Sequence, residues 1–516
     1  MSAAKFVNPY NFAPLPSSVP REPVEKTPGF KEIKKDFYTG WLEVEITTLT
    51  RLVMPSQRPE DIRNEGNHLI FNEFMYDRDS KSKIIPGTSL KGPVRAVMEA
   101  LSDSCLSIWN MKYEKKEKNK KKVTIFDYSD KLDKKFKSET CRFQNPQGRP
   151  VTEPGEGLCV CCRLFGATGK GVTKAEDDQT SAYNALQGRV VFGDAFLVEE
   201  DEGKICSTSL TLKELSSPKP WHDAFYLQNG KRLIRGRKFY VHQEEKETNY
   251  TEKVKTKRNR TVAQSILPGA RFRGRVYFTN LTPEELGLLL WGLELDDKEV
   301  TINEKGQPEI PEDLLAHKIG MGKPLGLGSV KIRVTQMAFF SDPAARYQNF
   351  SWDNTQASVL TPIEEINLKE KKQKIKAKWA KDAFQGKDEL KLLLKFKAFA
   401  GKTVRYPSYS WFDKCDKVLL PPPGGELEDP CTGGKTSGGS STTKSSGPAV
   451  PSGPFEEVVR VEEVTPQGAL VKIKEHSLLV KLPPYLRVGS GRRIKVKVTP
   501  KADGSWKAQF KSLVKD

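Results

Sequence analysis

Apolar and polar residues alternate in several short stretches of the chain, which is the pattern of strands with one buried face. Leu42, Val44 and Ile46 alternate with polar neighbours, and the same period returns at 272–278, between arginines, and at 330–334. A further strand is expected around 189–197. These four stretches predict the strands of one sheet.

Two helices are predicted between these strands. An apolar stripe at helical spacing runs from Leu90 to Leu101, behind Thr88 or Ser89 as the capping residue. The second helix is expected to start at Thr282, because Thr-Pro-Glu-Glu is a capping box with proline at the first helical position. The order of strands and helices predicts an α+β protein with a split βαβ, ferredoxin-like (RRM-like) core that carries large insertions.

The composition changes along the chain, and the changes predict four parts. Residues 1–350 are expected to form the core with its basic and cysteine-containing insertions, and residues 351–432 a lysine-rich helical extension. A Gly/Ser/Thr/Pro tract at 433–454 predicts a flexible linker. Valine-rich alternating runs at 455–516 predict a small all-β, OB-like barrel.

The balance of charge favours a polyanionic partner. The chain has 85 Lys+Arg against 66 Asp+Glu, a net charge of +19. Basic residues gather at 112–122, 231–238 and 253–260, and the last two segments flank Phe239, Tyr240 and Tyr250, a mixture suited to phosphate contact and base stacking. A solvated basic surface is the alternative. No apolar run is long enough for a membrane span, so we expect a soluble chain with reduced thiols and no membrane partner.

The segment 320–328 is rich in glycine and contains Lys323. Glycines let a nucleic-acid backbone approach main-chain amides, and a lysine can meet a phosphate. A tight turn that needs glycine for its own geometry is an equal alternative. The predicted RNA contacts of this loop are Gly320, Gly322, Lys323, Gly326 and Gly328.

Cys159 and Cys162 have the spacing of a zinc knuckle, and Cys141 lies upstream across a segment rich in proline and glycine. We expect these three thiolates to hold a structural zinc ion. The fourth ligand is open, with Cys105 and His68 as candidates, and buried thiols without metal are the alternative.

Three motifs resemble the repeat-associated mysterious protein (RAMP) superfamily of CRISPR-associated proteins. The stretch Ile-Pro-Gly-Thr-Ser-Leu-Lys-Gly at 85–92 looks like the entry to the first helix of these proteins, and the glycine-rich loop is their other hallmark. The segments 162–166 and 188–195 resemble the place where the core resumes after an insertion. Together the motifs cover about residues 41–334.

The resemblance implies a backbone subunit of a type III CRISPR effector, acting in antiviral defence in the prokaryotic cytoplasm. Its implied partners are a CRISPR guide RNA, a complementary target RNA and other effector subunits. Lys91 and Arg95 lie one helical turn apart, which suits consecutive phosphates. The expected contacts of a thumb-like hairpin are Arg235, Arg237, Lys238, Phe239 and Tyr240.

Catalysis is left open by the sequence. Subunits of this kind that cut RNA carry an aspartate before the Ile-Pro-Gly motif, and the candidates here are Asp61, Asp77 and Asp79, with a divalent metal such as magnesium. One alternative is an endoribonuclease that processes repeat RNA, which would need an acid/base side chain among the five histidines. Another is a general single-strand-binding protein.

Overall fold

A computed structural model forms two compact units, Met1–Gly433 and Gly434–Asp516. It describes residues 4–23, 34, 36–106, 112–115, 123–127, 141, 157–168, 185–215, 223–228, 234–256, 258–340, 360–362, 365–407, 409–415, 417–429, 455–465, 468–473, 476–480, 493–500 and 506–513. The basic run at 112–122 lies mostly outside these residues, and the predicted linker at 433–454 lies wholly outside them. No helix in the described part of the chain is long and apolar enough to cross a membrane.

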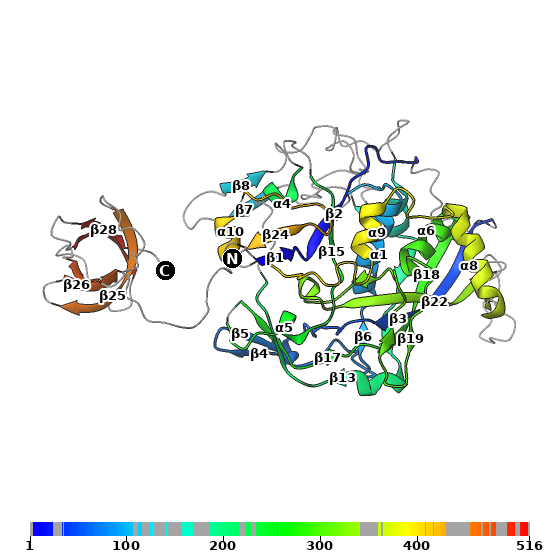
Figure 1. The fold of residues 1–516 in the computed structure, drawn as a ribbon, viewed down its shortest axis with the longest axis horizontal. Helices are drawn as coiled ribbons and strands as arrows, with labels where there is room; N and C mark the ends of the chain where they lie inside the picture. The colour runs from blue at the N-terminus through cyan, green and yellow to red at the C-terminus, as the bar shows by residue number, and fades with distance from the viewer. Residues whose placement is uncertain are drawn as a thin grey trace, which may run out of the picture. The chain divides into compact units, whose positions relative to one another are not determined.

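The first unit is a mixed α/β structure around one antiparallel sheet (Figure 1). Its strands run in the order β21-β22-β3-β18-β12-β6, with β11 also paired to β18 and β23 to β22. The bounds are β3 Tyr38–Thr48, β6 Ile84–Ile85, β11 Val190–Phe192, β12 Ala195–Leu197, β18 Arg271–Leu281, β21 His317–Lys318, β22 Ser329–Phe340 and β23 Leu360–Pro362. Three of the four predicted strands are therefore confirmed, as β3, β18 and β22, whereas the stretch around 189–197 forms two short strands, β11 and β12, with Gly193 and Asp194 between them.

The alternation seen in the sequence becomes the two faces of this sheet. In register across β18, β3 and β22, Phe272, Ile46 and Ile332 form one buried row. The next residue of each strand faces the other way, so that Arg273, Glu45 and Arg333 form an outward row, with an ion pair of 3.0 Å between Arg273 and Glu45. The apolar side chains therefore lie on one face of the sheet, which is buried, and the charged side chains lie on the other face.

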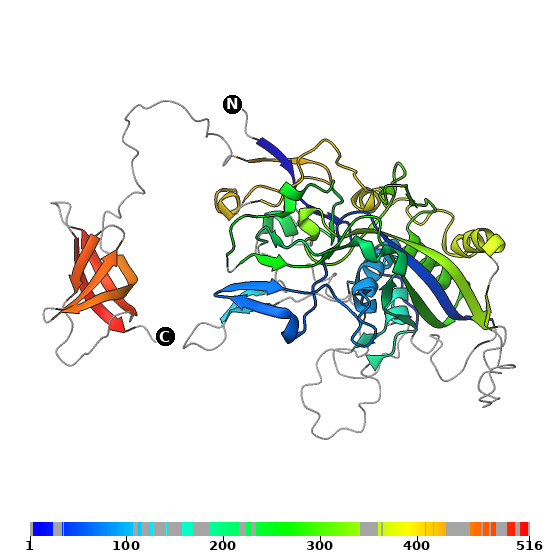
Figure 2. The ribbon, with the colours of Figure 1, turned by 90° about the horizontal axis from the view of Figure 1, so that it is seen from below.

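Helices α1 (Gly87–Leu101) and α6 (Pro283–Glu294) pack side by side against this sheet (Figures 1 and 2). The capping box at Thr282 is present as predicted. Helix α1 begins earlier than predicted, at Gly87 behind Pro86, and neither Thr88 nor Ser89 is its cap. Instead the carboxylate of Asp194 accepts the Gly87 amide at 2.8 Å, so the cap comes from a distant segment.

The lysine-rich extension contains helix α8 (Glu365–Trp379), which packs along α6 within the first unit (Figure 1). Buried Glu294 at the end of α6 accepts Lys372 at 2.6 Å and Lys376 at 2.8 Å. Lys376 also lies 4.9 Å from the ring centre of Trp291. These charge-assisted contacts explain how a helix with a weak apolar stripe is held on the core.

The remaining elements of the first unit are shorter. They include a four-stranded sheet, β14-β16-β5-β4, and pairs formed by the N-terminal strands, β1 with β24 and β2 with β15. Their bounds are β1 Ala4–Val7, β2 Tyr10–Ala13, β4 Ile62–Glu65, β5 His68–Phe71, β7 Lys112–Lys115, β8 Val123–Asp127, α3 Val160–Phe165, β9 Ala167–Thr168, β10 Ala185–Leu186, β13 Ile205–Cys206, β14 Leu210–Leu212, α4 Asp223–Tyr226, β15 Arg237–Tyr240, α5 Glu247–Tyr250, β16 Arg260–Val262, β17 Ser265–Ile266, β19 Thr301–Ile302, β20 Pro308–Glu309, α9 Asp388–Leu394, α10 Tyr409–Lys414 and β24 Glu426–Asp429.

The second unit is an all-β structure of five antiparallel strands. Its sheet order is β27-β26-β25-β28-β29, and the outer strands β27 and β29 also contact each other. The bounds are β25 Phe455–Thr465, β26 Gly468–Ile473, β27 His476–Val480, β28 Arg493–Pro500 and β29 Trp506–Leu513. The predicted alternating runs are thus strands.

Candidate functional site

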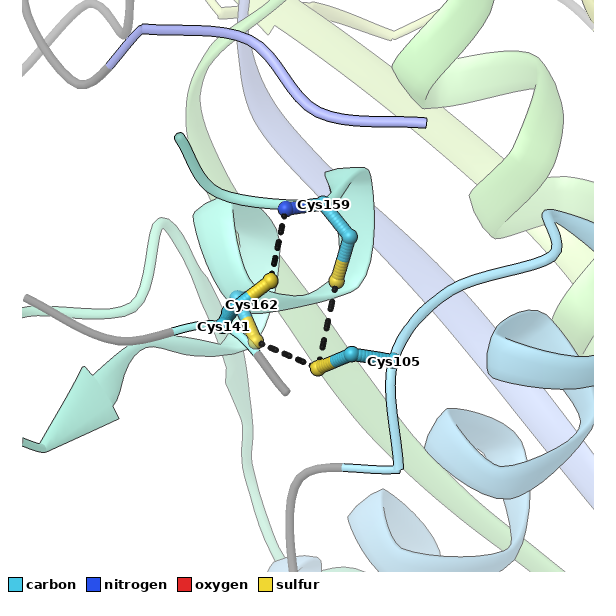
Figure 3. Close-up of side chains that lie close together, drawn as sticks. All are labelled: Cys105, Cys141, Cys159 and Cys162. Atoms are coloured by element: carbon cyan, nitrogen blue, oxygen red, sulfur yellow. Dashed lines mark hydrogen bonds between the residues drawn. The ribbon is translucent and has the colours of Figure 1, made fainter. Parts of the chain in front are cut away.

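Four cysteine side chains converge beside the end of α1 (Figure 3). Their sulfur atoms all lie within 4.8 Å of one another, and they belong to Cys105, Cys141, Cys159 and Cys162. The Cys105 sulfur is 3.5 Å from that of Cys162 and 3.7 Å from that of Cys159. Three of the side chains are buried and Cys141 is partly exposed.

The donor set fits a tetrahedral ion. With zinc–sulfur bonds of about 2.3 Å, the edges of a ZnS₄ tetrahedron are about 3.8 Å long, close to the two sulfur distances above. The structure places Cys105, which follows α1, against the start of α3, where Cys159 and Cys162 lie one turn apart. The other candidate ligand, His68, lies elsewhere and is hydrogen-bonded to Thr256 and Thr261. The four cysteines could therefore hold a metal ion.

Lys91 and Arg95 lie together on α1, as their spacing predicted. The Lys91 ammonium donates to the Phe165 carbonyl at 3.4 Å, and Arg95 pairs with Glu99 at 2.8 Å. Both cations sit over the Phe165 ring, at 5.9 and 5.6 Å from its centre. Burial, and then the charge of Arg95, lower the pKa of Lys91. Both side chains remain partly exposed.

The segment predicted to form thumb contacts is largely built into the fold. Arg237 is buried, and its guanidinium pairs with Glu99 at 2.7 Å and donates to the Cys105 carbonyl at 3.0 Å. Phe239 is also buried, and Arg235 donates to the Leu420 carbonyl. These contacts place Arg237 and Phe239 in the interior, where they stabilise the fold.

Lys238 and Tyr240 differ from their neighbours because both are partly exposed. The Lys238 ammonium lies 3.7 Å from the ring centre of Tyr10 and 5.2 Å from that of Tyr240, and donates to the Tyr226 hydroxyl at 3.2 Å. Burial lowers the pKa of Lys238 to about 8. This lysine is therefore surrounded by aromatic faces.

The glycine-rich loop connects β21 to β22 and is closely packed. All four glycines have positive φ, and a Cβ on Gly328 would lie 2.0 Å from the Ile319 carbonyl oxygen. A Cβ on Gly320 would lie 2.5 Å from the Val53 carbonyl oxygen. These two glycines are thus required by the turn itself. Lys323 is mostly buried, which lowers its pKa.

Beneath the loop lies a fully buried lysine that no motif pointed to. Lys318 donates to the carbonyls of Gly326 at 3.0 Å and Leu327 at 2.9 Å. Burial lowers the pKa of Lys318 to about 7, with the charge of Lys323 acting in the same direction. Its ammonium therefore ties the loop to β21, and no carboxylate among the described residues forms an ion pair with it.

This lysine predicts a dependence of stability on pH. The pKa of Lys318 is lower in the fold than in the unfolded chain, so between pH 7 and 10 the unfolded state binds the extra proton and stability rises with pH. The wild type should gain up to about 2 kcal/mol from this group between pH 7 and 9. Urea denaturation at both pH values gives the change in the free energy of unfolding for the wild type and for Lys318→Met, and the contribution of this lysine is the difference between the two changes. Equal gains in the two proteins would contradict it.

The three candidate catalytic aspartates are placed differently. Asp61 is buried and accepts the Ser56 hydroxyl at 2.6 Å. Asp77 accepts the amide and the hydroxyl of Ser80, both at 2.8 Å, and the Ser80 amide lowers the pKa of Asp77. Asp79 is exposed. Among the described residues, the cysteines are the one group of three or more metal-binding side chains close together.

Three of the five histidines, His68, His242 and His317, are buried, and burial reduces the basicity of the last two. Burial holds the pKa of His242 well below its usual range and lowers that of His317 to about 4. His242 is hydrogen-bonded to Ser329 at 2.9 Å and to the Ala316 carbonyl at 3.0 Å. These two side chains, and buried His68, are poorly placed for acid/base work on a surface ligand. His222 lies outside the described residues.

These features define a mixed α/β protein with basic side chains on the first helix of its core and a glycine-rich loop before the last strand. A family model described as the RAMP superfamily matches residues 45–331, more than half of the chain. The chain belongs to the RAMP superfamily, and the resemblance noted from the motifs is confirmed at this level.

Among solved structures, the chain is similar to one titled "Crystal structure of Thermofilum pendens Csc2". The identity is 15%, the match covers 74% of this chain and 91% of that chain, and the TM-score is 0.27. No curated protein matches the chain.

Proposed function

We propose that this chain is a guide-RNA-binding backbone subunit of a type III CRISPR ribonucleoprotein effector. Membership of the RAMP superfamily carries the proposal. Further support comes from the motif at 85–92, which leads into α1, and from the net charge of +19. The partners in this proposal are the guide RNA, a complementary target RNA and the other effector subunits.

The proposal includes a ferredoxin-like core. Along the chain its elements are β3, α1, β12, β18, α6 and β22, a βαββαβ order. In the sheet the strands stand as β22-β3-β18-β12, so the last strand lies beside the first and each helix joins two strands that are not neighbours. This is the arrangement expected of two interleaved βαβ units.

We also assign the second unit to the OB-like barrels. The first of its five strands, β25, pairs with both β26 and β28, and β27 and β29 complete the ring by their contact. A five-stranded barrel closed in this way is the usual frame of single-strand-binding modules. Its role in this subunit would be to bind nucleic acid.

The cysteine cluster is assigned a structural zinc ion. Its ligands would be Cys105, Cys141, Cys159 and Cys162, which fill all four positions of a closed tetrahedral site. A closed site leaves no position for a substrate. The ion would therefore hold the end of α1 against α3, the helix whose Phe165 contacts Lys91 and Arg95.

Copurification from the native host tests the function most directly. The expected result is a discrete short guide RNA together with other CRISPR subunits. Recovery of the chain alone, or with RNA of random length and no other subunit, would contradict the proposal and favour a general single-strand-binding protein.

Binding of RNA by this chain should depend steeply on salt, because phosphate contacts release counterions. Lys91→Glu should weaken binding about tenfold for any sequence and lower the slope of log K against log salt by about one. Fluorescence anisotropy with labelled single-stranded RNA measures both quantities. The matched control is Lys378→Glu, an exposed lysine on α8 with the same change of charge. Equal binding by the two variants would exclude Lys91 as a phosphate contact.

Cleavage of the target remains a prediction from the resemblance. Asp77 and Asp79 are the accessible candidates, while Asp61 is buried and bonded to Ser56. For the alternative of a repeat-RNA processing enzyme, the buried positions of His68, His242 and His317 disfavour these three described side chains as its acid or base. Removing each aspartate in the assembled complex, with divalent metal and a matched target, distinguishes a cutting subunit from a scaffold.

A further inference from the structure

A groove lies beside the glycine-rich loop, with residues 397–407 along its other side. It consists of two adjoining hollows of about 210 and 380 Å³. The larger hollow reaches Pro324 and Leu325 of the loop, and the smaller extends along 397–402. The hollows are adjacent, since both are lined by Gln243, Asn249, Thr403 and Val404.

Both walls of the groove are held by hydrogen bonds within the first unit. On one side, the Gln243 amide donates to the Pro324 carbonyl at 3.0 Å and so ties the 243–249 segment to the glycine-rich loop. On the other, the Val7 amide donates to the Thr403 carbonyl at 2.8 Å, and the Arg405 amide donates to the Val7 carbonyl at 3.2 Å. The groove is therefore formed before any ligand binds, which lowers the cost of binding.

The lining of the groove favours an anion. The residues that line it include five basic ones, Lys213, Lys246, Lys397, Lys402 and Arg405, and three acidic ones, Glu214, Glu244 and Glu252, of which Glu244 pairs with Lys246 at 3.7 Å. Glu214 pairs with Arg258 at 3.4 Å, and Arg405 pairs with buried Asp429. Lys397 and Lys402 are both exposed on the same wall, where the described lining residues include no carboxylate, and the Lys402 ammonium donates to the Gly424 carbonyl at 2.9 Å. A row of this kind suits successive phosphates.

The larger hollow adds groups that can hold a base. Tyr406 is partly exposed there, and its ring lies 6.1 Å from that of Phe412, which supports it from the aromatic core. Asn249 lines the same hollow, and a side-chain amide of this kind can both donate and accept hydrogen bonds. A volume of about 380 Å³ falls within the range of about 300 to 1,000 Å³ that is usual for ligand pockets.

We propose that this groove binds one segment of single-stranded RNA, with phosphates at Lys397 and Lys402 and a base against Tyr406. The inference rests on the proposed function and specifies where the RNA runs. Residues 397–407 lie beyond the region matched by the family model, which ends at 331. The extension of the chain would thus supply one wall of the RNA site, and the core would supply the other.

The test uses the full chain and fluorescein-labelled single-stranded RNA of mixed sequence. Lys397→Glu with Lys402→Glu should weaken binding at least tenfold and lower the salt slope by about two. Lys378→Glu with Lys381→Glu changes the net charge equally on exposed side chains outside the groove and should leave the slope unchanged. Tyr406→Ala should weaken binding several-fold, while Tyr406→Phe keeps the ring and the affinity.

A photochemical measurement completes the test. RNA that contains 4-thiouridine should crosslink to the peptide that includes Tyr406 when the wild-type complex is irradiated. If the wild type binds RNA but the groove variants keep their slope and the crosslinks lie elsewhere, the groove is not the site, although the proposed function stands. Failure of the wild type to bind RNA at all would overturn the proposed function and this inference together.

Discussion

Purified wild-type protein is expected to contain one zinc ion per chain, and Cys162→Ser is expected to lose it. Because the four sulfurs come from three separate stretches of chain, at 105, 141 and 159–162, loss of the ion would remove the link between these stretches and leave buried thiols in its place. The free energy of unfolding should fall by about 4 kcal/mol or more. Elemental analysis and urea denaturation measure the two effects.

The chain offers a matched control for this substitution. Cys161 is also buried, and in the sequence it lies between Cys159 and Cys162. Its sulfur, however, lies 3.6 Å from the Ser102 hydroxyl and is not part of the four-cysteine cluster. Cys161→Ser should therefore keep the zinc, with a smaller loss of stability. A metal-free wild type that a chelator does not destabilise would identify the four residues as buried thiols.

Glu285→Gln is expected to destabilise the first unit by about 3 to 5 kcal/mol, because it removes the charge that balances a buried arginine. Glu285 binds Arg189 through two oxygens, at 2.6 and 2.9 Å, and the two side chains are only 4% and 2% exposed. A second arginine, Arg163, lies 3.6 Å from the same carboxylate. The guanidinium groups of Arg189, just before β11, and of Arg163, in α3, therefore both lie at the Glu285 carboxylate in the first turn of α6.

The neighbouring residue is the control. Glu284 lies in the same first turn of α6 but is exposed, so Glu284→Gln should change the free energy of unfolding by no more than about 0.5 kcal/mol. Urea denaturation of the full chain compares the variants. If both variants lost a similar amount of free energy of unfolding, the negative charge at the start of the helix would contribute more to stability than the buried ion pair.

The sequence alone determined the elements of the core. Alternation at 42–46, 272–278 and 330–334 specifies strands because successive side chains of a strand face opposite sides. The capping box at Thr282 specified the start of α6 because both of its hydrogen bonds are local. Ordered motifs also indicated the superfamily, which the family match confirmed.

Only the tertiary structure decided which distant residues meet. The cap of α1 is Asp194, more than one hundred positions from Gly87, and Cys105 joins the other cysteines only when α1 packs beside α3. Arg237 was predicted to contact RNA, yet it lies beneath the surface on Glu99. The walls of the groove, at 243–249 and 397–407, likewise come together only in the folded chain. The reason is that sequence spacing shows which side chains share a face of one element, whereas burial depends on which other elements cover that face.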